Sequence, residues 1–226
     1  MRKKSEDALS RLKDRLEFMT EIGADFMFPP DAAPHKAPDK AEILARLREK
    51  ILTCRLCPLA AGRTQAVPGE GNIRTELMFV GEAPGHDEDV QGRPFVGRAG
   101  QLLTRIIEAM KYRREDVFIA NVVKCRPPGN RTPQRDEVEK CQAYLLAQIR
   151  AIRPKVIVAL GKVSTDFFHP STLAMGELRG RFFEFDGISV MPTFHPAYIL
   201  RNEGNKEVKK LVWQDMQNVM ALLDKK

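Results

Sequence analysis

The chain lacks several features that would mark it as a membrane, secreted or dinucleotide-dependent protein. No apolar run approaches the roughly 20 residues of a membrane-spanning helix. The basic residues of positions 1–17 have no apolar core segment behind them, so we expect no signal peptide and an intracellular protein. No internal repeat is visible. The GxGxxG pattern does not follow the first predicted strand, which ranks a dinucleotide-binding oxidoreductase far below the alternatives developed below.

Cysteine is also scarce, and the rest of the composition is that of one basic globular domain. Four cysteines in an intracellular chain favour metal ligands or buried thiols over disulfides. A chain of 226 residues that is 43% hydrophobic suits one α/β domain with an extra N-terminal piece. A net charge of +7 favours an acidic partner, with nucleic acid ahead of an anionic membrane; a merely soluble basic protein is the alternative.

Two regions are predicted. Residues 5–22 carry apolar side chains at helical spacing, and residues 28–38 are rich in proline and alanine, so 1–38 is interpreted as an amphipathic helix and a stiff linker. Residues 39–226 form the main domain. Helices are predicted at 39–52, with Asp39 as N-cap, and at 102–110, 136–152, 163–168 and 207–223. They alternate with apolar runs at 77–80, 117–123, 156–160 and 188–191, which predicts a three-layer α/β/α fold with a mostly parallel sheet of about four strands.

The four cysteines have a spacing that suits a single site. Cys54 and Cys57 form a CxxC pair, Cys125 ends a predicted strand, and Cys141 lies in a predicted helix. Four thiolates placed in this way can converge on one tetrahedral centre, and both zinc and a [4Fe–4S] cluster accept such a set. A redox-active CxxC would leave two cysteines unexplained. Buried cysteines without a ligand are the remaining alternative.

Polar and aromatic residues gather in three loops at predicted strand ends. These loops span residues 81–85, 121–131 and 194–198, and they bring a carboxylate, an amide, an imidazole, an aromatic ring and several basic groups toward one cleft. An Asn side chain offers a donor beside an acceptor, which matches the O4 and N3–H edge of uracil, and an aromatic face can stack on the base. The set indicates a nucleobase site, although each residue alone is weak evidence.

Four motifs in these regions resemble a known family. GEAPG at 81–85, GRPFVGRAGQLL at 92–103, NVVKCRPPGNR at 121–131 and HPAYILR at 195–201 are similar to the family 4 uracil-DNA glycosylases, over about residues 41–223. The resemblance implies a cytoplasmic, nucleoid-associated bacterial repair enzyme that acts as a monomer. It would flip uracil out of DNA and hydrolyse the N-glycosidic bond, leaving an abasic site and free uracil. It also implies a structural [4Fe–4S] cluster on Cys54, Cys57, Cys125 and Cys141.

The resemblance also implies roles for residues around the base. Asn121 would recognise the Watson–Crick edge of the flipped uracil, Phe95 would stack on it, and His195 would donate a hydrogen bond to O2, where negative charge develops. Whether His195 is neutral or cationic stays open at this point. Because Asn121 and Cys125 share one short stretch, the metal site is expected to hold the loop that carries the amide.

Three residues of the first motif loop complete this expected pocket. Backbone amides around Glu82 and Ala83 would hold the ring, and Glu82 would orient the hydrolytic water. Glu88 would crowd the C5 side of the base and disfavour a thymine methyl. Ala83 stands where the best-known branch of the superfamily has a water-assisting aspartate. The loop after PFVG lacks the basic, His-containing insertion of the relatives that trap DNA covalently, which favours ordinary turnover.

DNA contacts are expected beside the motif loops. Arg126, Arg131 and Arg201 are candidate phosphate contacts. Tyr198 and Leu200 follow the HPA turn, where glycosylases place apolar side chains that fill the space left by the flipped base; packing of a helix start is the alternative. For the whole protein, the alternative function is a cysteine-metal DNA-binding module that has the glycosylase fold but no catalysis.

Overall fold

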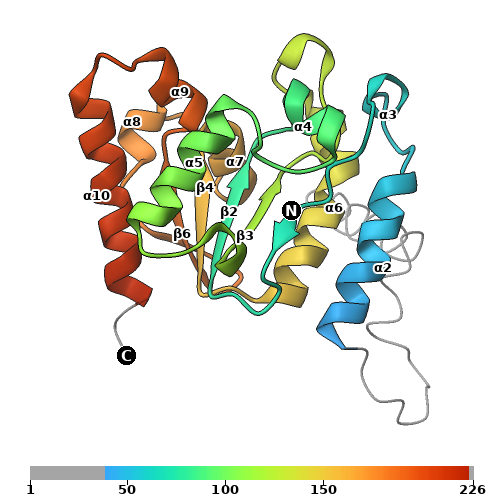
Figure 1. Cartoon of the computed structure of the whole chain (residues 1–226), viewed down its shortest axis with the longest axis horizontal. Coiled ribbons are helices and arrows are strands. Elements are labelled where there is room, and N and C mark those ends of the chain that lie inside the picture. The colour runs from blue at the N-terminus through green and yellow to red at the C-terminus, as the bar shows by residue number, and fades with distance from the viewer. Residues whose placement is uncertain (1–38, 224–226) are drawn as a thin grey trace, which may run out of the picture.

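A computed structural model describes residues 39–223, which form a six-stranded sheet between two layers of helices (Figure 1). The strand order is β1-β3-β2-β4-β6-β5. The strands are β1 (Glu70–Gly71), β2 (Leu77–Gly81), β3 (Phe118–Asn121), β4 (Val156–Leu160), β5 (Phe183–Phe185) and β6 (Ile188–Thr193). The inner four pair in parallel, which confirms the predicted sheet, whereas the short edge strands β1 and β5 pair antiparallel and were not predicted.

Within residues 39–223, the five predicted helices lie where the sequence pattern places them, and four short α-helices are additional. The helices are α2 (Lys40–Thr53), α3 (Leu59–Gly62), α4 (His86–Gln91), α5 (Arg98–Ala109), α6 (Arg135–Ile152), α7 (Lys162–Phe168), α8 (Met175–Leu178), α9 (Pro196–Arg201) and α10 (Lys206–Leu223). Asp39 occupies the predicted N-cap position of α2, but its side chain makes no capping hydrogen bond. The helix and linker predicted within residues 1–38 lie outside the described residues.

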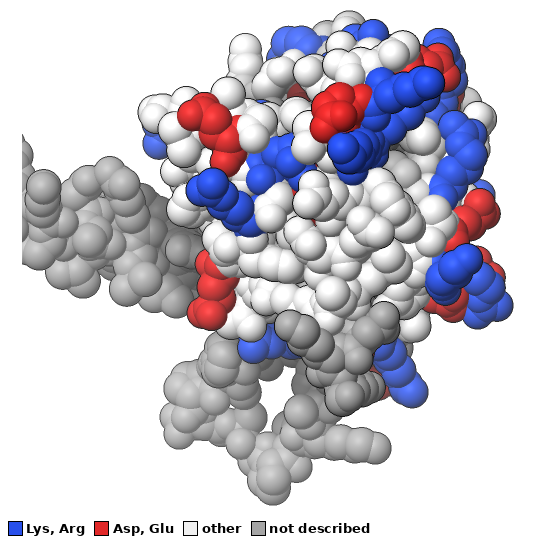
Figure 2. All heavy atoms as spheres, turned by 90° about the vertical axis from the view of Figure 1, so that its left-hand side faces the viewer, with Lys and Arg blue, Asp and Glu red and all other residues white. Residues whose placement is uncertain are grey.

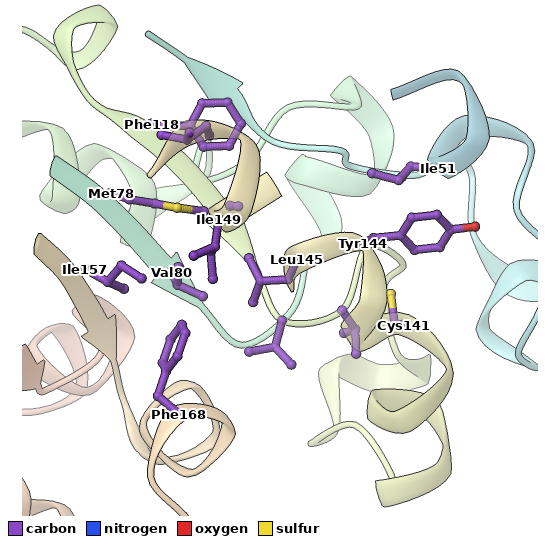
Figure 3. Packing of buried hydrophobic residues seen from close by; sticks show 14 of the residues in the cluster. Ile51, Met78, Val80, Phe118, Cys141, Tyr144, Leu145, Ile149, Ile157 and Phe168 are labelled. Carbon is purple, nitrogen blue, oxygen red and sulfur yellow. The ribbon is translucent and has the colours of Figure 1, made fainter. Parts of the chain in front are cut away.

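The inner strands are buried on both faces, so successive side chains point into two different cores. Met78 and Val80 of β2 belong to a cluster with residues of α2, α6 and α7 (Figure 3). Leu77 and Phe79 of the same strand pack instead against residues of α5 and α10. Because strands buried on both faces appear as continuous apolar runs, this arrangement explains why the sequence predicted these strands and the three layers.

The strand order places the ends of the inner strands around one crevice. The strand β2 pairs with β3 on one side and with β4 on the other, so the chain crosses over β2 between them. Such a switch in strand order opens a crevice at the carboxyl ends of the strands. In register, Gly81 at the end of β2 pairs with Asn121 at the end of β3. Among residues 39–223, none of the helices has the length and apolar character needed to cross a membrane.

Candidate active site

A cleft of about 760 Å³ lies at the carboxyl ends of the inner strands. Loops from β2, β3, β4 and β6 all contribute to its wall. Most of the predicted site residues therefore meet in one place; the cleft-lining members of the predicted set are Glu82, Ala83, Glu88, Phe95, Asn121, Arg131, His195, Tyr198 and Arg201. Arg126 and Leu200 do not line it.

Asn121 and Phe95 form a narrow slot at the base of the cleft. The Asn121 side chain is only 1% exposed, and its Oδ1 is the one buried side-chain oxygen or nitrogen without a hydrogen-bond partner among residues 39–223. A Cβ at Gly81 would lie 2.5 Å from that oxygen and 2.5 Å from Cζ of Phe95, so glycine at this position lets both side chains take their places in the slot. Since a buried acceptor without a partner is costly, the slot is preorganised for a ligand that supplies a donor.

Phe95 is held in an uncommon backbone conformation by its neighbours. Its φ is 51°, in the left-handed region. Glu88 accepts hydrogen bonds from the backbone N–H groups of Val96 and Gly97, both at 2.8 Å, and from that of Gly85 at 3.0 Å. The carboxylate thus ties the start of α4 to the segment that carries the aromatic ring. That Glu88 crowds the C5 side of the base remains a prediction. In the structure both of its carboxylate oxygens accept backbone hydrogen bonds.

His195 lies beside the same slot as a neutral hydrogen-bond donor. Its ring centroid is 5.7 Å from that of Phe95, with an angle of 31° between the planes. The backbone N–H of Ala197 donates to Nδ1 at 3.1 Å, so the ring proton is on Nε2. Burial, with a further contribution from Arg201, lowers the pKa of His195 to about 4. The sequence left its charge open, and these contacts indicate a neutral imidazole near pH 7.

Glu82 also lines the cleft and carries a partly buried carboxyl group. Burial raises the pKa of Glu82 above its usual value, although a hydrogen bond with Thr132 and the charge of Arg201 act in the other direction. The backbone N–H of Val123 donates to the Glu82 carbonyl at 3.1 Å, so strand pairing continues past β2 and fixes this residue. A partly buried carboxylate of this kind is suited to orienting a water molecule.

The three predicted phosphate-binding arginines lie in different surroundings. Arg131 makes a bidentate pair with Glu137, at 2.7 and 2.9 Å, and that carboxylate is only 1% exposed. Arg126 donates to Asn130 Oδ1 at 2.7 Å on the rim. Arg201 lines the cleft and acts electrostatically on the catalytic candidates described above. Arg131 is therefore paired with a buried carboxylate while its own side chain stays 39% exposed and lines the cleft, as Arg201 also does, whereas Arg126 lies outside the cleft lining.

Only one of the two predicted apolar DNA contacts stands at the mouth of the cleft. Tyr198 is 38% exposed and stacks on Phe194, with ring centroids 4.9 Å apart and 21° between the planes. Ile199 is buried, and Leu200 is half-buried and lies outside the cleft lining. Among Tyr198, Ile199 and Leu200, only Tyr198 lines the cleft.

The four cysteines lie together at the α2 side of α6. The thiols are close enough for the charge of one to raise the pKa of another. Cys54 acts in this way on Cys57, Cys54 and Cys57 act on Cys125, and Cys57 and Cys125 act on Cys141. Figure 3 shows Cys141 and Tyr144 projecting from α6 toward Ile51 of α2. Within the described residues, no three His, Cys, Asp or Glu side chains are arranged as ligands of a single ion.

The chemistry of this thiol group fits an iron–sulfur cluster. Burial raises the pKa of Cys57 and Cys125, and that of Cys141 to about 12, so without a metal these thiols would stay protonated. Arg63 donates to Cys125 Sγ at 2.9 Å, and the backbone N–H of Lys124 donates to Cys141 Sγ at 3.3 Å. Hydrogen bonds to the sulfurs of a four-thiolate set are a usual feature of such clusters. The donor set therefore suits the group that the resemblance implies.

Sequence reasoning missed several residues of this region. Thr132 contacts Glu82, and Met175 on α8 forms part of the cleft wall. Lys124 is 1% exposed, and burial lowers its pKa to about 8. A lysine within the apolar run Val122-Val123-Lys124-Cys125 was a visible signal, since lysine is rarely buried without a reason. Arg63 gave no such signal.

Comparison with known proteins agrees with this site. The model of the uracil DNA glycosylase superfamily matches residues 68–217. The chain is 46% identical over 188 residues to a type-4 uracil-DNA glycosylase of Thermotoga maritima, covering 82% of this chain and 97% of the relative. It is 44% identical over 197 residues to the enzyme of that name from Saccharolobus solfataricus, covering 83% and 88%. The chain therefore belongs to the uracil DNA glycosylase superfamily and, within it, to the type-4 enzymes.

Proposed function

We propose that the protein excises uracil from DNA by base flipping and hydrolysis, releasing free uracil and leaving an abasic site. The observation that carries this proposal is the unpaired, buried Oδ1 of Asn121, set beside the rings of Phe95 and His195. An amide in this slot can accept from uracil N3–H and donate to O4. Cytosine presents the opposite polarity at those two positions, so the same amide would reject it.

The chemistry of the leaving base assigns the remaining roles. Breaking the glycosidic bond places negative charge on the uracil ring and positive, oxocarbenium-like charge on the sugar. His195, neutral and protonated on Nε2, donates to O2 as charge develops there, and one such donor is worth roughly 3–4 kcal/mol. Glu82 orients the attacking water and, as an anion, stabilises the sugar. Glu88 positions Phe95 through its three backbone hydrogen bonds and narrows the C5 side.

The DNA strand is proposed to cross the end of the molecule that carries the cleft. In Figure 1 the inner strands point upward, and Figure 2, turned about the same vertical axis, shows Lys and Arg gathered in the upper part of one face. Arg126 and Arg201 are the proposed phosphate contacts, and Arg131 supports the loop through Glu137. Tyr198, braced by Phe194, is proposed to occupy the space that the flipped base vacates.

The four cysteines are proposed to hold a [4Fe–4S] cluster. When bound, the group supplies a structural cross-link between α2, the loop after β3 and α6, and no redox step of the reaction. Arg63 and the backbone N–H of Lys124 donate to two of the four sulfurs and so favour their thiolate form. Protein purified without oxygen should be brown, with absorbance near ~400 nm and about four irons per chain. Stoichiometric zinc without iron would contradict this part of the proposal.

A strand-scission assay tests the activity. Purified protein is incubated with matched oligonucleotides that contain one uracil or one thymine, and alkali then cleaves any abasic site. Cleavage that depends on uracil supports the proposal, and its absence contradicts it. The second candidate, a DNA-binding module without catalysis, is separated by Asn121→Ala and His195→Ala, which should each slow cleavage by at least ~10²-fold while DNA retention on a filter persists. Arg135→Ala, which removes an exposed ion pair with Glu139, is the surface control.

A further inference from the structure

Lys124 is a fully buried lysine whose ammonium group faces two neutral acceptors. The residue is 1% exposed, and its Nζ donates to the carbonyl of Asn121 at 2.9 Å and to Oε1 of Gln148 at 2.7 Å. Gln148 is itself held, because its Nε2 donates to the carbonyl of Pro68 at 2.7 Å. The lysine therefore has a fixed position, and neither acceptor is a carboxylate.

Burying an ammonium beside neutral groups alone is expensive, so a compensating negative charge is expected nearby. The thiol group supplies it. Lys124 immediately precedes Cys125, and its backbone N–H donates to Cys141 Sγ at 3.3 Å. A cluster with four thiolate ligands has a net negative charge, and charged groups around it affect its stability. The lysine would thus offset part of the negative charge of the cluster, together with the Arg63 guanidinium that donates to Cys125 Sγ at 2.9 Å.

The other end of this lysine contacts the residue that recognises the base. The carbonyl that accepts from Nζ belongs to Asn121, whose side chain forms the slot with Phe95. The backbone N–H of Val122 donates to the Gly81 carbonyl at 2.9 Å, so one side of Asn121 is fixed by strand pairing and its carbonyl by Lys124. A shift of this carbonyl would rotate the amide away from the position that uracil requires.

We infer that Lys124 is a positioning residue, which serves as the internal counter-charge of the cysteine cluster and holds the backbone of Asn121 in the base-recognising position. This inference rests on the proposed function and deepens it, because it names the residue through which cluster occupancy and uracil recognition are coupled. Lys124 is buried and does not line the cleft, so it would contact neither the base nor the sugar. Its effect on excision should therefore pass through Asn121.

A double-mutant cycle tests this coupling. Single-turnover excision is measured for the wild type, Lys124→Met, Asn121→Ala and the double variant. Coupled neighbours typically interact by 0.5–3 kcal/mol, so K124M should slow excision by about 2-fold to 150-fold. In the N121A background the same change should cost less than about twofold, because the amide it positions is gone. Equal losses in both backgrounds would overturn the inference.

Iron retention provides a second readout, which does not depend on excision. Loss of absorbance near ~400 nm is followed in air for the wild type, K124M and Lys124→Arg. K124M should lose iron several-fold faster, whereas K124R, which keeps the charge, should lose it at nearly the wild-type rate. Ser164→Ala is the matched control, since it removes a buried hydrogen bond to the Val80 carbonyl, at 2.7 Å, away from the cysteines. Iron loss from K124M at the rate of S164A would overturn the counter-charge role.

Two outcomes require additional measurements. If K124M is recovered only as aggregate, Gln148→Leu replaces it: this change removes one acceptor of Lys124 and keeps the charge, and its effect on excision must also vanish in the N121A background. If the wild type excises no uracil, the proposed function fails, while the iron-loss comparison still decides whether Lys124 acts as the counter-charge of the cluster.

Discussion

Replacing Asn121 by leucine should make the protein more stable and nearly inactive. Leucine has the same number of side-chain heavy atoms and a similar shape, but it has no polar group. In the free protein, Oδ1 of Asn121 is buried without a partner, and such an atom costs about 1–3 kcal/mol of desolvation. Removing this oxygen should raise the free energy of unfolding by about the same amount, 1–3 kcal/mol. For a chain of this length the melting temperature should rise by about 2–12 °C.

The same substitution should abolish recognition of the base. Uracil N3–H and O4 would enter the slot and find no partner, and each unpaired group costs about 1–3 kcal/mol. The sum lowers kcat/KM by about 30-fold to 10⁴-fold, at 1.36 kcal/mol for each factor of ten. Excision is measured in single turnover on a uracil oligonucleotide, and stability by thermal denaturation followed by circular dichroism, both on protein with matched iron content.

Ser164→Ala provides the contrast for this prediction. Its Oγ donates to the Val80 carbonyl at 2.7 Å, so this buried group is satisfied. Its removal should lower stability by about 0.5–1.5 kcal/mol and leave excision unchanged. If N121L instead destabilises the protein as S164A does, the oxygen is not an unpaired acceptor. If N121L excises uracil at the wild-type rate, Asn121 is not the base-recognising residue.

Three further perturbations follow from the same geometry. Gly81→Ala would place a Cβ 2.5 Å from both Asn121 Oδ1 and Phe95 Cζ, so it should cost about 1–3 kcal/mol of stability by urea titration and eliminate detectable uracil binding; wild-type excision would disprove the slot. The rate of excision should decline as the pH is lowered, because Glu82 gains a proton and can no longer act as a carboxylate. Burial raises the pKa of Glu82, whereas the pKa of His195 is lowered to about 4, so Glu82 is expected to be protonated first. Glu82→Gln should excise uracil ~10²-fold more slowly, and its rate should no longer decline at low pH. If the decline persists in this variant, a group other than Glu82 is responsible for it. Arg179→Met would leave the fully buried Asp215 carboxylate without its ion pair and cost about 3–5 kcal/mol. Burial already raises the Asp215 pKa and loss of the arginine should raise it further, so this loss should grow as the pH rises above the folded-state pKa of Asp215 in the wild type, and a loss independent of pH would contradict the assignment.

The inner strands and the longer helices could be predicted from the sequence because each is encoded by a long pattern of neighbouring residues. The inner strands are apolar runs buried on both faces, and helices such as α6, with 18 residues, contain several turns of periodic pattern. The helices α3 and α8 have four residues each, too few for a period to emerge. Edge strand β1 has two residues, and its pairing depends on β3, which lies far along the chain.

The candidate site was predictable in its membership and less so in its contacts. Motif loops at strand ends placed Glu82, Asn121 and His195 at one crevice, because the topology brings parallel strand ends together. The binding of three backbone N–H groups by Glu88 depends on the path of a loop with a left-handed residue at Phe95, which no local pattern encodes. The pairing of Arg131 with Glu137 likewise depends on the path of the loop that carries it, and the role of Arg131 as a phosphate contact stays a prediction.

The neutral state of His195 shows what only three-dimensional contacts could supply. The sequence gives an HPA turn, but the tautomer depends on the hydrogen bond from Ala197 N–H to Nδ1, and the charge depends on burial next to Arg201. Lys124 is the converse case. Its position in an apolar run was visible, but its two acceptors lie on different elements, at Asn121 and Gln148.

The most direct test of the account is the release of free uracil from DNA, measured by chromatography of the small-molecule fraction under single-turnover conditions. The wild-type protein should release uracil from a uracil-containing strand and no thymine from the matched strand. His195→Ala and Asn121→Ala, with unchanged iron content, should each slow this release by at least ~10²-fold. Release of thymine at a comparable rate, or release of uracil that is unaffected by both substitutions, would contradict the assignment of this cleft as the uracil site.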